Sequence, residues 1–234
     1  MVTTTLTRLA VIPGLVIIIY IYGKDKVEKE PINLIFRLMI FGALCCYVAG
    51  TMERIIMAFL PAYPSGSLLY ALTNAFLVAG LCEELVKFLA LRLGSWRHPS
   101  FNYRFDGIVY GVSVAVGFAI LENVMYVFSY GFQTAIVRAF TAVPLHAFCG
   151  AVMGIFYSYS KKASIDGNTT ASIGYSLLAY LIPLTIHGIY DTFAMMRTQL
   201  ASILLFAFVI FLYIEVTRMI NRMSAADHAG SFYN

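Results

Sequence analysis

Residues 105–128 read FDGIVYGVSVAVGFAILENVMYVF, a run that is apolar almost throughout but ends in a group of polar residues. About 20 apolar helical residues cross the hydrocarbon core of a bilayer, which is about 30 Å thick. This stretch is therefore expected to cross a membrane as a helix. Most of the chain shares this character, since 60% of its 234 residues are hydrophobic and 12% are charged, against about 25% charged residues in soluble domains.

Further apolar runs on both sides of this stretch predict about seven transmembrane helices. The runs are continuous and lack the alternation over segments of about ten residues that marks a membrane β-barrel. The sequence thus predicts an all-α, polytopic membrane bundle that forms a single integral-membrane domain over residues 1–234. The predicted spans are 7–22, 32–51, 72–93, 107–130, 136–159, 172–194 and 199–219.

Basic residues alternate between the loops that join these spans, and loops rich in lysine and arginine tend to remain in the cytoplasm. Such residues gather in loop 23–31, in loop 94–106, after residue 160 and in the C-terminal tail. We therefore predict an N-terminus outside and a C-terminus inside. The net charge of +4 is explained by these loops beside an anionic leaflet, so the lipid bilayer is an expected partner and nucleic acid is not.

The longest connection, 52–71, contains Pro61, Pro64 and Gly66, which break helices. Its apolar part is expected to rest on the outer membrane surface, either as an ordinary interfacial loop or as a lid over a site. Glu53 and Arg54 at its start are expected to form a solvated ion pair.

The stretch GLCEELVKFLALRL, residues 80–93, places two glutamates and a lysine inside an apolar run. An ionised side chain at the centre of a bilayer costs roughly 2.5–3.5 kcal/mol on insertion scales, so such residues usually face a cavity or a partner. Lys87 follows Glu83 by four residues and Glu84 by three, so it can reach either carboxylate. One glutamate is then neutralised, and the other is a candidate general base that acts on water.

The opening stretch carries Asp106 at its start and Glu122, Asn123 and Tyr126 near its end. Glu122 and Tyr126 are four residues apart, so they lie on the same face of the helix. This helix is therefore expected to present polar side chains at one depth.

Glycines at a spacing of four residues occur in two of the predicted spans. Small residues at this spacing let neighbouring helices approach closely. In the span 136–159, the glycine stripe is headed by His146. The residues expected to pack helices together are Gly107, Gly111, Gly150 and Gly154.

In the span 172–194, His187 and Asp191 are four residues apart. At this spacing a carboxylate can fix the tautomer of a histidine or share a metal with it. Counted along the helices at 1.5 Å per residue, the polar residues of four spans lie at nearly the same depth. We therefore predict one site in the outer half of the membrane, with Glu83, Glu84, Glu122, His146 and His187 as its candidate catalytic residues.

Several classes of function would use such a cluster. A proton-coupled transporter also needs buried carboxylates and histidines, although the inverted repeats common in transporters are not apparent. A structural membrane partner, in which the cluster only holds helices together, is a third alternative. The HExxH motif is absent, but His146, His187 and Glu122 form a ligand set that zinc accepts, so zinc is a candidate cofactor.

Five stretches of the chain resemble the PrsW family of bacterial intramembrane proteases, which is distantly similar to the CAAX-processing, glutamate-dependent membrane proteases. They are PGLVIIIYIYGKDKVEKEP (13–31), EELVK (83–87), FDGIVYGVSVAVGFAILENVMYV (105–127), VPLHAFCGAVMG (143–154) and HGIYD (187–191). The resemblance extends over nearly the whole chain. It implies a multi-pass protease of a bacterial cell membrane that makes the first cut in a single-span anti-sigma factor, so that a sigma factor is released.

The mechanism expected from these residues uses Glu83 or Glu84 as the base that takes a proton from water. His146 or His187, with Glu122 and Asn123 nearby, would stabilise the oxyanion or protonate the leaving nitrogen. Lys87, Tyr126, Asp106 and Asp191 are expected in supporting roles, Lys87 by orienting a glutamate and Asp191 by orienting His187. Metal-free and metal-dependent chemistry are both compatible with the sequence.

Overall fold

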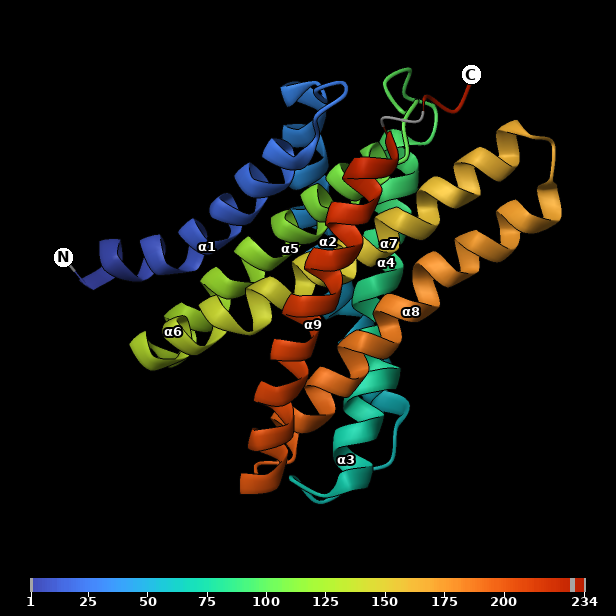
Figure 1. Cartoon of the computed structure of the whole chain (residues 1–234). Coiled ribbons are helices and arrows are strands. Elements are labelled where there is room, and N and C mark those ends of the chain that lie inside the picture. Colours follow the sequence, from blue (N-terminus) through green and yellow to red (C-terminus); the bar gives the residue numbers. More distant parts are fainter. Residues whose placement is uncertain (1, 228–229, 234) are drawn as a thin grey trace.

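The computed structural model describes residues 2–227 and 230–233, and within them every regular element is a helix (Figure 1). The all-α prediction is thereby confirmed. The elements are α1 Val2–Lys24, α2 Ile32–Phe59, α3 Leu68–Leu72, η1 Thr73–Gly80, α4 Leu81–Ser95, α5 Asp106–Tyr130, α6 Phe132–Phe140, α7 Ala142–Ile165, α8 Thr169–Met195 and α9 Gln199–Ala226.

Within the described residues, six helices are long and apolar enough to cross a membrane. The other predicted span, 72–93, lies in a continuous helical run from Leu68 to Ser95. This run consists of α3, the π-helix η1 and α4, and α4 has only 15 residues, fewer than the roughly 20 that crossing requires. The predicted number of seven is reached when the three segments are taken together as one span.

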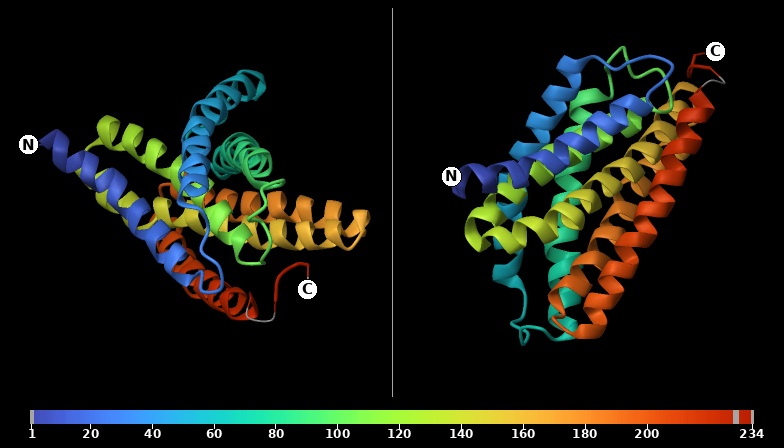
Figure 2. Two further views of the ribbon diagram at one scale, coloured as in Figure 1. Left: turned by 90° about the horizontal axis from the view of Figure 1, so that it is seen from above. Right: turned by 60° about the vertical axis from the view of Figure 1, so that its left-hand side comes forward.

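Helices α5 and α7 form the centre of the bundle. Helix α5 packs against α1, α2 and α7, and α7 packs against α8 (Figure 2). The four glycines of these two helices lie at their contact: a Cβ added to Gly111 would overlap the carbonyl oxygen of Gly150, and one added to Gly154 would overlap that of Gly107. The missing side chains thus allow the two backbones to meet, as small residues do between membrane helices.

Two of the boundaries that differ from the predicted ones affect the placement of polar residues. Helix α2 continues to Phe59, eight residues beyond the predicted end, because nothing in residues 52–59 breaks a helix before Pro61. The predicted span 136–159 is divided into α6 and α7 by Thr141, which has non-helical dihedral angles. Pro144 then lies in the first turn of α7, where its missing N–H costs little.

The π-helix η1 directly precedes the two glutamates of α4. The N–H of Leu81 donates to the carbonyl of Phe76, five residues earlier, as in a π-helix rather than an α-helix. Gly80 lies at the end of this segment, where an added Cβ would lie 2.8 Å from the carbonyl oxygen of Ala75 and 3.4 Å from that of Leu184 in α8. The wider turn therefore packs closely against α8.

Loop 23–31, loop 94–106 and the C-terminal tail, all predicted to be cytoplasmic, lie together at the top of Figure 1, and the turn between α7 and α8 lies apart from them at the upper right. Three hydrogen bonds join the two loops and the tail: Ser224 Oγ donates to the Lys24 carbonyl (2.6 Å), Asn102 Nδ2 to Glu28 (3.1 Å), and the Phe232 N–H to the Asn102 carbonyl (2.7 Å). Loops 60–67 and 196–198 lie at the opposite end. This grouping agrees with the alternation of basic loops, and the assignment of this end to the cytoplasm stays a prediction.

Candidate functional site

Helix α4 brings three buried charged side chains into contact. Lys87 Nζ lies 3.1 Å from Glu83 Oε2 and 2.9 Å from Glu84 Oε1. The ammonium group also lies 4.0 Å from the centre of the Phe118 ring, which adds a cation–π contact. The lysine therefore pairs with both glutamates, where the sequence had suggested that it would neutralise one.

Helices α5, α6 and α7 contribute a second set of contacts. His146 Nε2 lies 2.9 Å from Glu122 Oε2, and Arg138 Nη2 donates to the same oxygen at 2.5 Å. Arg138 Nε donates to Asn123 Oδ1 at 2.9 Å, and its guanidinium lies 4.1 Å from the centre of the Tyr126 ring. Arg138 thus ties α6 to the three polar residues of α5.

His187 on α8 has carboxylates at both ring nitrogens. Its Nδ1 lies 2.8 Å from Glu84 Oε1, and its Nε2 lies 3.4 Å from Asp191 Oδ2 and 3.9 Å from Glu83 Oε2. The rings of His187 and His146 are 5.2 Å apart and nearly perpendicular. The imidazole of His187 is therefore held in place from two helices.

The hydrogen bonds around His146 indicate its tautomer. Lys87 Nζ lies 3.0 Å from His146 Nδ1, and an ammonium group donates hydrogen bonds but cannot accept them. Nδ1 is then an acceptor, and the ring proton lies on Nε2, which donates to Glu122. A neutral histidine with a defined tautomer results.

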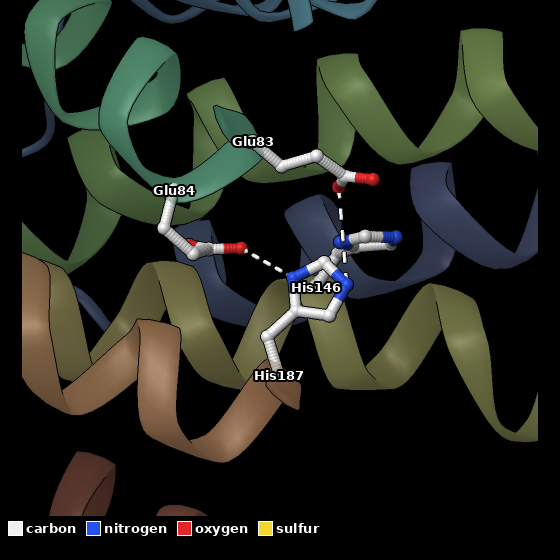
Figure 3. A group of neighbouring side chains, drawn as sticks. All are labelled: Glu83, Glu84, His146 and His187. Atoms are coloured by element: carbon white, nitrogen blue, oxygen red, sulfur yellow. Dashed lines mark hydrogen bonds and ion pairs between the residues drawn. The ribbon is translucent and has the colours of Figure 1, made fainter. Parts of the chain in front are cut away.

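A metal ion could be held where four of these side chains converge. Glu83, Glu84, His146 and His187 are all buried and point toward one another (Figure 3), and each offers one ligand atom within 4.8 Å of the others. Carboxylate oxygen and imidazole nitrogen are ligands that zinc accepts. Glu84 Oε2 is buried and has no hydrogen-bond partner among the described residues. The residues present therefore fit a metal ion. Because the Lys87 ammonium contacts three of these four side chains, it would have to move away when a metal ion binds.

A cavity of about 290 Å³ adjoins the cluster. Glu83, Glu122, His146 and His187 line it, whereas Glu84 is fully buried and does not reach the cavity wall. Apolar side chains of α2, η1 and α8 form other parts of the wall; they include Met57, Val78 and Met195. A molecule in the cavity would thus reach Glu83 and both histidines.

The structure brings together most of the residues predicted for this site. Glu83, Glu84, Lys87, Glu122, His146, His187 and Asp191 contact one another, and Asn123 and Tyr126 join them through Arg138.

One predicted role needs correction, and one stays a prediction. Asp106 lies about 24 Å from Glu122 along α5, at 1.5 Å per residue, and its carboxylate caps the N–H groups of Asn102 and Tyr103. It therefore gives no direct support to the cluster. Glu122, a candidate metal ligand, lies outside the four-residue set but contacts its member His146, so its role as a ligand stays a prediction.

Sequence reasoning missed two residues of the site. Arg138 lies in the predicted span 136–159 but received no role, and Glu53 was expected in a solvated ion pair, yet both line the cavity. A signal was available for Arg138, since an arginine inside an apolar stretch demands a partner. For Glu53 the signal was the absence of a helix breaker between residues 52 and 59.

Comparison with known proteins agrees with this arrangement. The profile of the PrsW family, described as intramembrane metalloproteases, matches residues 30–216. The chain is 34% identical to Protease PrsW of Clostridioides difficile (strain 630), over 88% of this chain and 85% of that protein. It is 33% identical to Protease PrsW of Geobacillus kaustophilus (strain HTA426), over 80% of this chain and 78% of the relative. No solved structure matches the chain significantly.

The matched region begins in the loop before α2 and ends within α9, so it includes every side chain of the cluster. The relatives are bacterial, and six helices of the chain can cross a membrane. The chain accordingly belongs to the PrsW family of intramembrane metalloproteases, as a multi-pass protease of a bacterial cell membrane.

Proposed function

We propose that the chain is an endopeptidase that makes the first cut in a single-span anti-sigma factor, on its extracytoplasmic side, and so leads to release of a sigma factor. The observation that carries the proposal is the cavity in which Glu83, His146 and His187 meet. The substrate class rests on the resemblance of the EELVK and HGIYD stretches to the PrsW family.

Glu83 is our candidate for the general base. Its side chain lines the cavity, whereas Glu84 is fully buried between Lys87 and His187. A base must reach the water that it deprotonates within hydrogen-bond distance. Glu84 would position Lys87 and His187, and Lys87 would hold the Glu83 carboxylate toward the cavity.

The two histidines would take different parts. His187 lies between Glu84 and Asp191, so its ring can carry a proton on the nitrogen near the cavity and deliver it to the leaving nitrogen. His146 is fixed as the neutral tautomer by Lys87 and Glu122. Donors that are fixed in place before the reaction stabilise a developing oxyanion without reorganisation.

A metal ion bound by Glu83, Glu84, His146 and His187 would supply Lewis-acid polarisation of the peptide carbonyl or of the attacking water. In that case Glu122 and Asp191 would orient the histidine ligands, as carboxylates commonly do. Zinc is the ion that this ligand set favours.

The peptide bonds of a helix are shielded by the surrounding turns, so the scissile segment must be extended when it enters the cavity. Extended chain is easier to obtain beside a transmembrane span than within it, because backbone groups in lipid must be paired. We therefore expect cleavage in a juxtamembrane stretch of the substrate.

The test is cleavage of a tagged, single-span anti-sigma factor in proteoliposomes by the unmodified protein and by Glu83→Gln and Glu84→Gln variants that elute as folded protein. We expect cutting by the unmodified protein and none by Glu83→Gln. Absence of cutting by any of them, across several substrates, would overturn the proposal in favour of a proton-coupled transporter or a structural protein. Addition of a chelator, followed by zinc, distinguishes metal-dependent from metal-free cleavage.

A further inference from the structure

Glu53 on α2 lies on the wall of the same cavity. Because α2 continues to Phe59, the segment that was expected to form a surface loop is helical and brings Glu53 to this wall. The expected ion pair with Arg54 is not formed: Arg54 Nη2 donates to Thr51 Oγ1 at 3.1 Å instead. Among the described residues, the Glu53 carboxylate has no hydrogen bond and no ion pair.

The other acidic side chains of the cavity are all paired. Glu83 lies 3.1 Å from Lys87, Glu122 lies 2.5 Å from Arg138, and Asp191 lies 3.4 Å from His187. Glu53 is half-buried, and its charged neighbours are the carboxylates of Glu122 and Asp191 together with His187 and Lys87. Among the described residues, the cavity thus has one carboxylate without a hydrogen bond or ion pair, while His187 and Lys87 are in direct contact with other acids.

The apolar part of the wall indicates what kind of side chain would fit beside this carboxylate. Met57 lies one helical turn after Glu53 on α2, and Val78 and Met195 line the same cavity. Lysine and arginine have a long apolar stem and a charged end, so the stem can pack on apolar surface while the end pairs with a carboxylate. A carboxylate beside a methionine-lined wall suits such a residue.

We propose that Glu53 is a specificity-determining residue that binds a lysine or arginine side chain of the substrate near the scissile bond. The inference rests on the proposed proteolytic function and adds a substrate preference to it. A basic side chain would neutralise Glu53 and relieve its repulsion by Glu122 and Asp191. An arginine could also form two parallel hydrogen bonds with the carboxylate.

The test compares two substrates that differ at a single position. One is a single-span substrate with a lysine or arginine next to its mapped cut site, and the other carries methionine there, which keeps the apolar stem but lacks the charge. Both are offered in proteoliposomes to the unmodified protein, to Glu53→Gln and to Glu215→Gln. Glu215 is a control because it lies on the exposed face of α9 and pairs with Arg218.

The unmodified protein is expected to show a KM about tenfold or more lower for the basic substrate, as expected for one charge-assisted hydrogen bond. Glu53→Gln should abolish this difference by raising KM for the basic substrate to that for the methionine substrate, and Glu215→Gln should preserve it. Because the two substrates can be compared with the unmodified protein alone, the test does not depend on the folding of a variant.

Three results would overturn the inference. The unmodified protein could cut both substrates with equal KM, Glu53→Gln could retain the preference, or Glu53→Gln could lower kcat equally for both substrates, which would make Glu53 part of the chemistry. In each of these cases the proteolytic function stands. If the unmodified protein cuts neither substrate, the proposed function fails and the inference fails with it.

Discussion

The chain buries two groups of carboxylates, and they are stabilised in different ways. In the α4 cluster, defined by Glu83, Glu84, Glu122 and Asp191, each acid has a basic partner within 3.4 Å: Lys87, His187 or Arg138. In the loop cluster at the other end, defined by Asp25, Glu30, Asp106 and Asp227, the acids accept hydrogen bonds mainly from backbone N–H groups and a tyrosine.

The difference lies in what each arrangement holds in place. In the loop cluster, Asp227 caps the N–H groups of Arg104 and Phe105, so it holds a loop against the end of α9. Lys29 is the nearby cation, and its ammonium donates to the carbonyls of Tyr22 and Asp25 rather than to a carboxylate. Ion pairs between side chains position those side chains for chemistry, whereas carboxylates that accept hydrogen bonds from N–H groups hold the backbone of a loop in place. The loop cluster is therefore structural in character.

The largest expected difference is between substitutions of Lys87 in the α4 cluster and Lys29 in the loop cluster, measured as the change in the free energy of unfolding. Lys87→Met removes the ammonium group that two buried glutamates share and leaves His187 as their remaining basic neighbour, so it should lower the free energy of unfolding by about 3–5 kcal/mol. Lys29→Met removes an exposed cation and should cost less than about 1 kcal/mol. Denaturation in detergent measures both variants, and equal losses would contradict the distinction between the clusters. If the four-residue set binds metal, zinc should restore more stability to Lys87→Met than to the unmodified protein.

Arg138→Met tests whether the paired cations of the α4 cluster position catalytic groups. Without the guanidinium, Glu122 keeps His146 as its partner but loses its fixed position, so cleavage should fall about 10–100-fold, as when a carboxylate that orients a histidine is disturbed. Arg54→Met is the control, because Arg54 is exposed and donates only to Thr51. Unchanged turnover by a folded Arg138→Met would remove Arg138 from the site.

The loop cluster should make stability depend on pH. Burial raises the pKa of Glu30 to about 7, although the Tyr110 hydroxyl opposes the shift, and burial raises that of Asp25 to about 6 against the opposing charge of Lys29. The folded chain then keeps protons that the unfolded chain has released, so the free energy of unfolding falls as pH rises toward 7. Each proton contributes at most about 1.4 kcal/mol per pH unit.

Glu30→Gln tests this effect between pH 6 and 7, where the folded chain holds more of the proton of Glu30 than of that of Asp25. The glutamine cannot lose a proton, so thermal unfolding of the variant should depend less on pH in this interval than that of the unmodified protein. A slope that persists unchanged in the variant would show that Glu30 is not the group responsible.

Tyr110→Phe should have the smallest effect, about 1 kcal/mol, because it removes one hydrogen bond to Glu30. The hydroxyl favours the ionised carboxylate, so the loss should be larger at pH 8 than at pH 5. Tyr47→Phe on the exposed face of α2 provides the comparison. A loss independent of pH would indicate that the Tyr110 hydroxyl does not act on the charge of Glu30.

Apolar run length and the spacing of charges explain how much of the molecule the sequence could predict. Runs of about 20 apolar residues located the long helices, and spacings of three and four residues anticipated the contacts of Lys87 with Glu83 and Glu84. Comparing depths along the helices brought His146 and His187 to the same layer. Each of these predictions requires only the sequence of a single helix, or a count of residues along neighbouring helices.

Features that depend on how helices turn and pack against each other were beyond such reasoning. Asp106 lies on the same helix as Glu122, but its carboxylate accepts hydrogen bonds from backbone N–H groups of the preceding loop. Arg138 reaches the cluster only because α6 folds back after Gly131, which has a φ of 82°. The place of Glu53 depends on the length of α2, and segment ends are less certain than segment centres.

The π-helical turn before α4 has a consequence for tolerance of insertions and deletions. Each residue in an α-helix advances the chain by about 100° around the axis, so removing one residue from Thr73–Gly80 could restore regular α-helical pairing and add to local stability. The same deletion would rotate α3 relative to Glu83 and Glu84 by about that angle, and either the contact with α8 or the direction of the glutamates would be lost. Substitutions along η1, except at Gly80, should therefore be accepted far more readily than changes in its length.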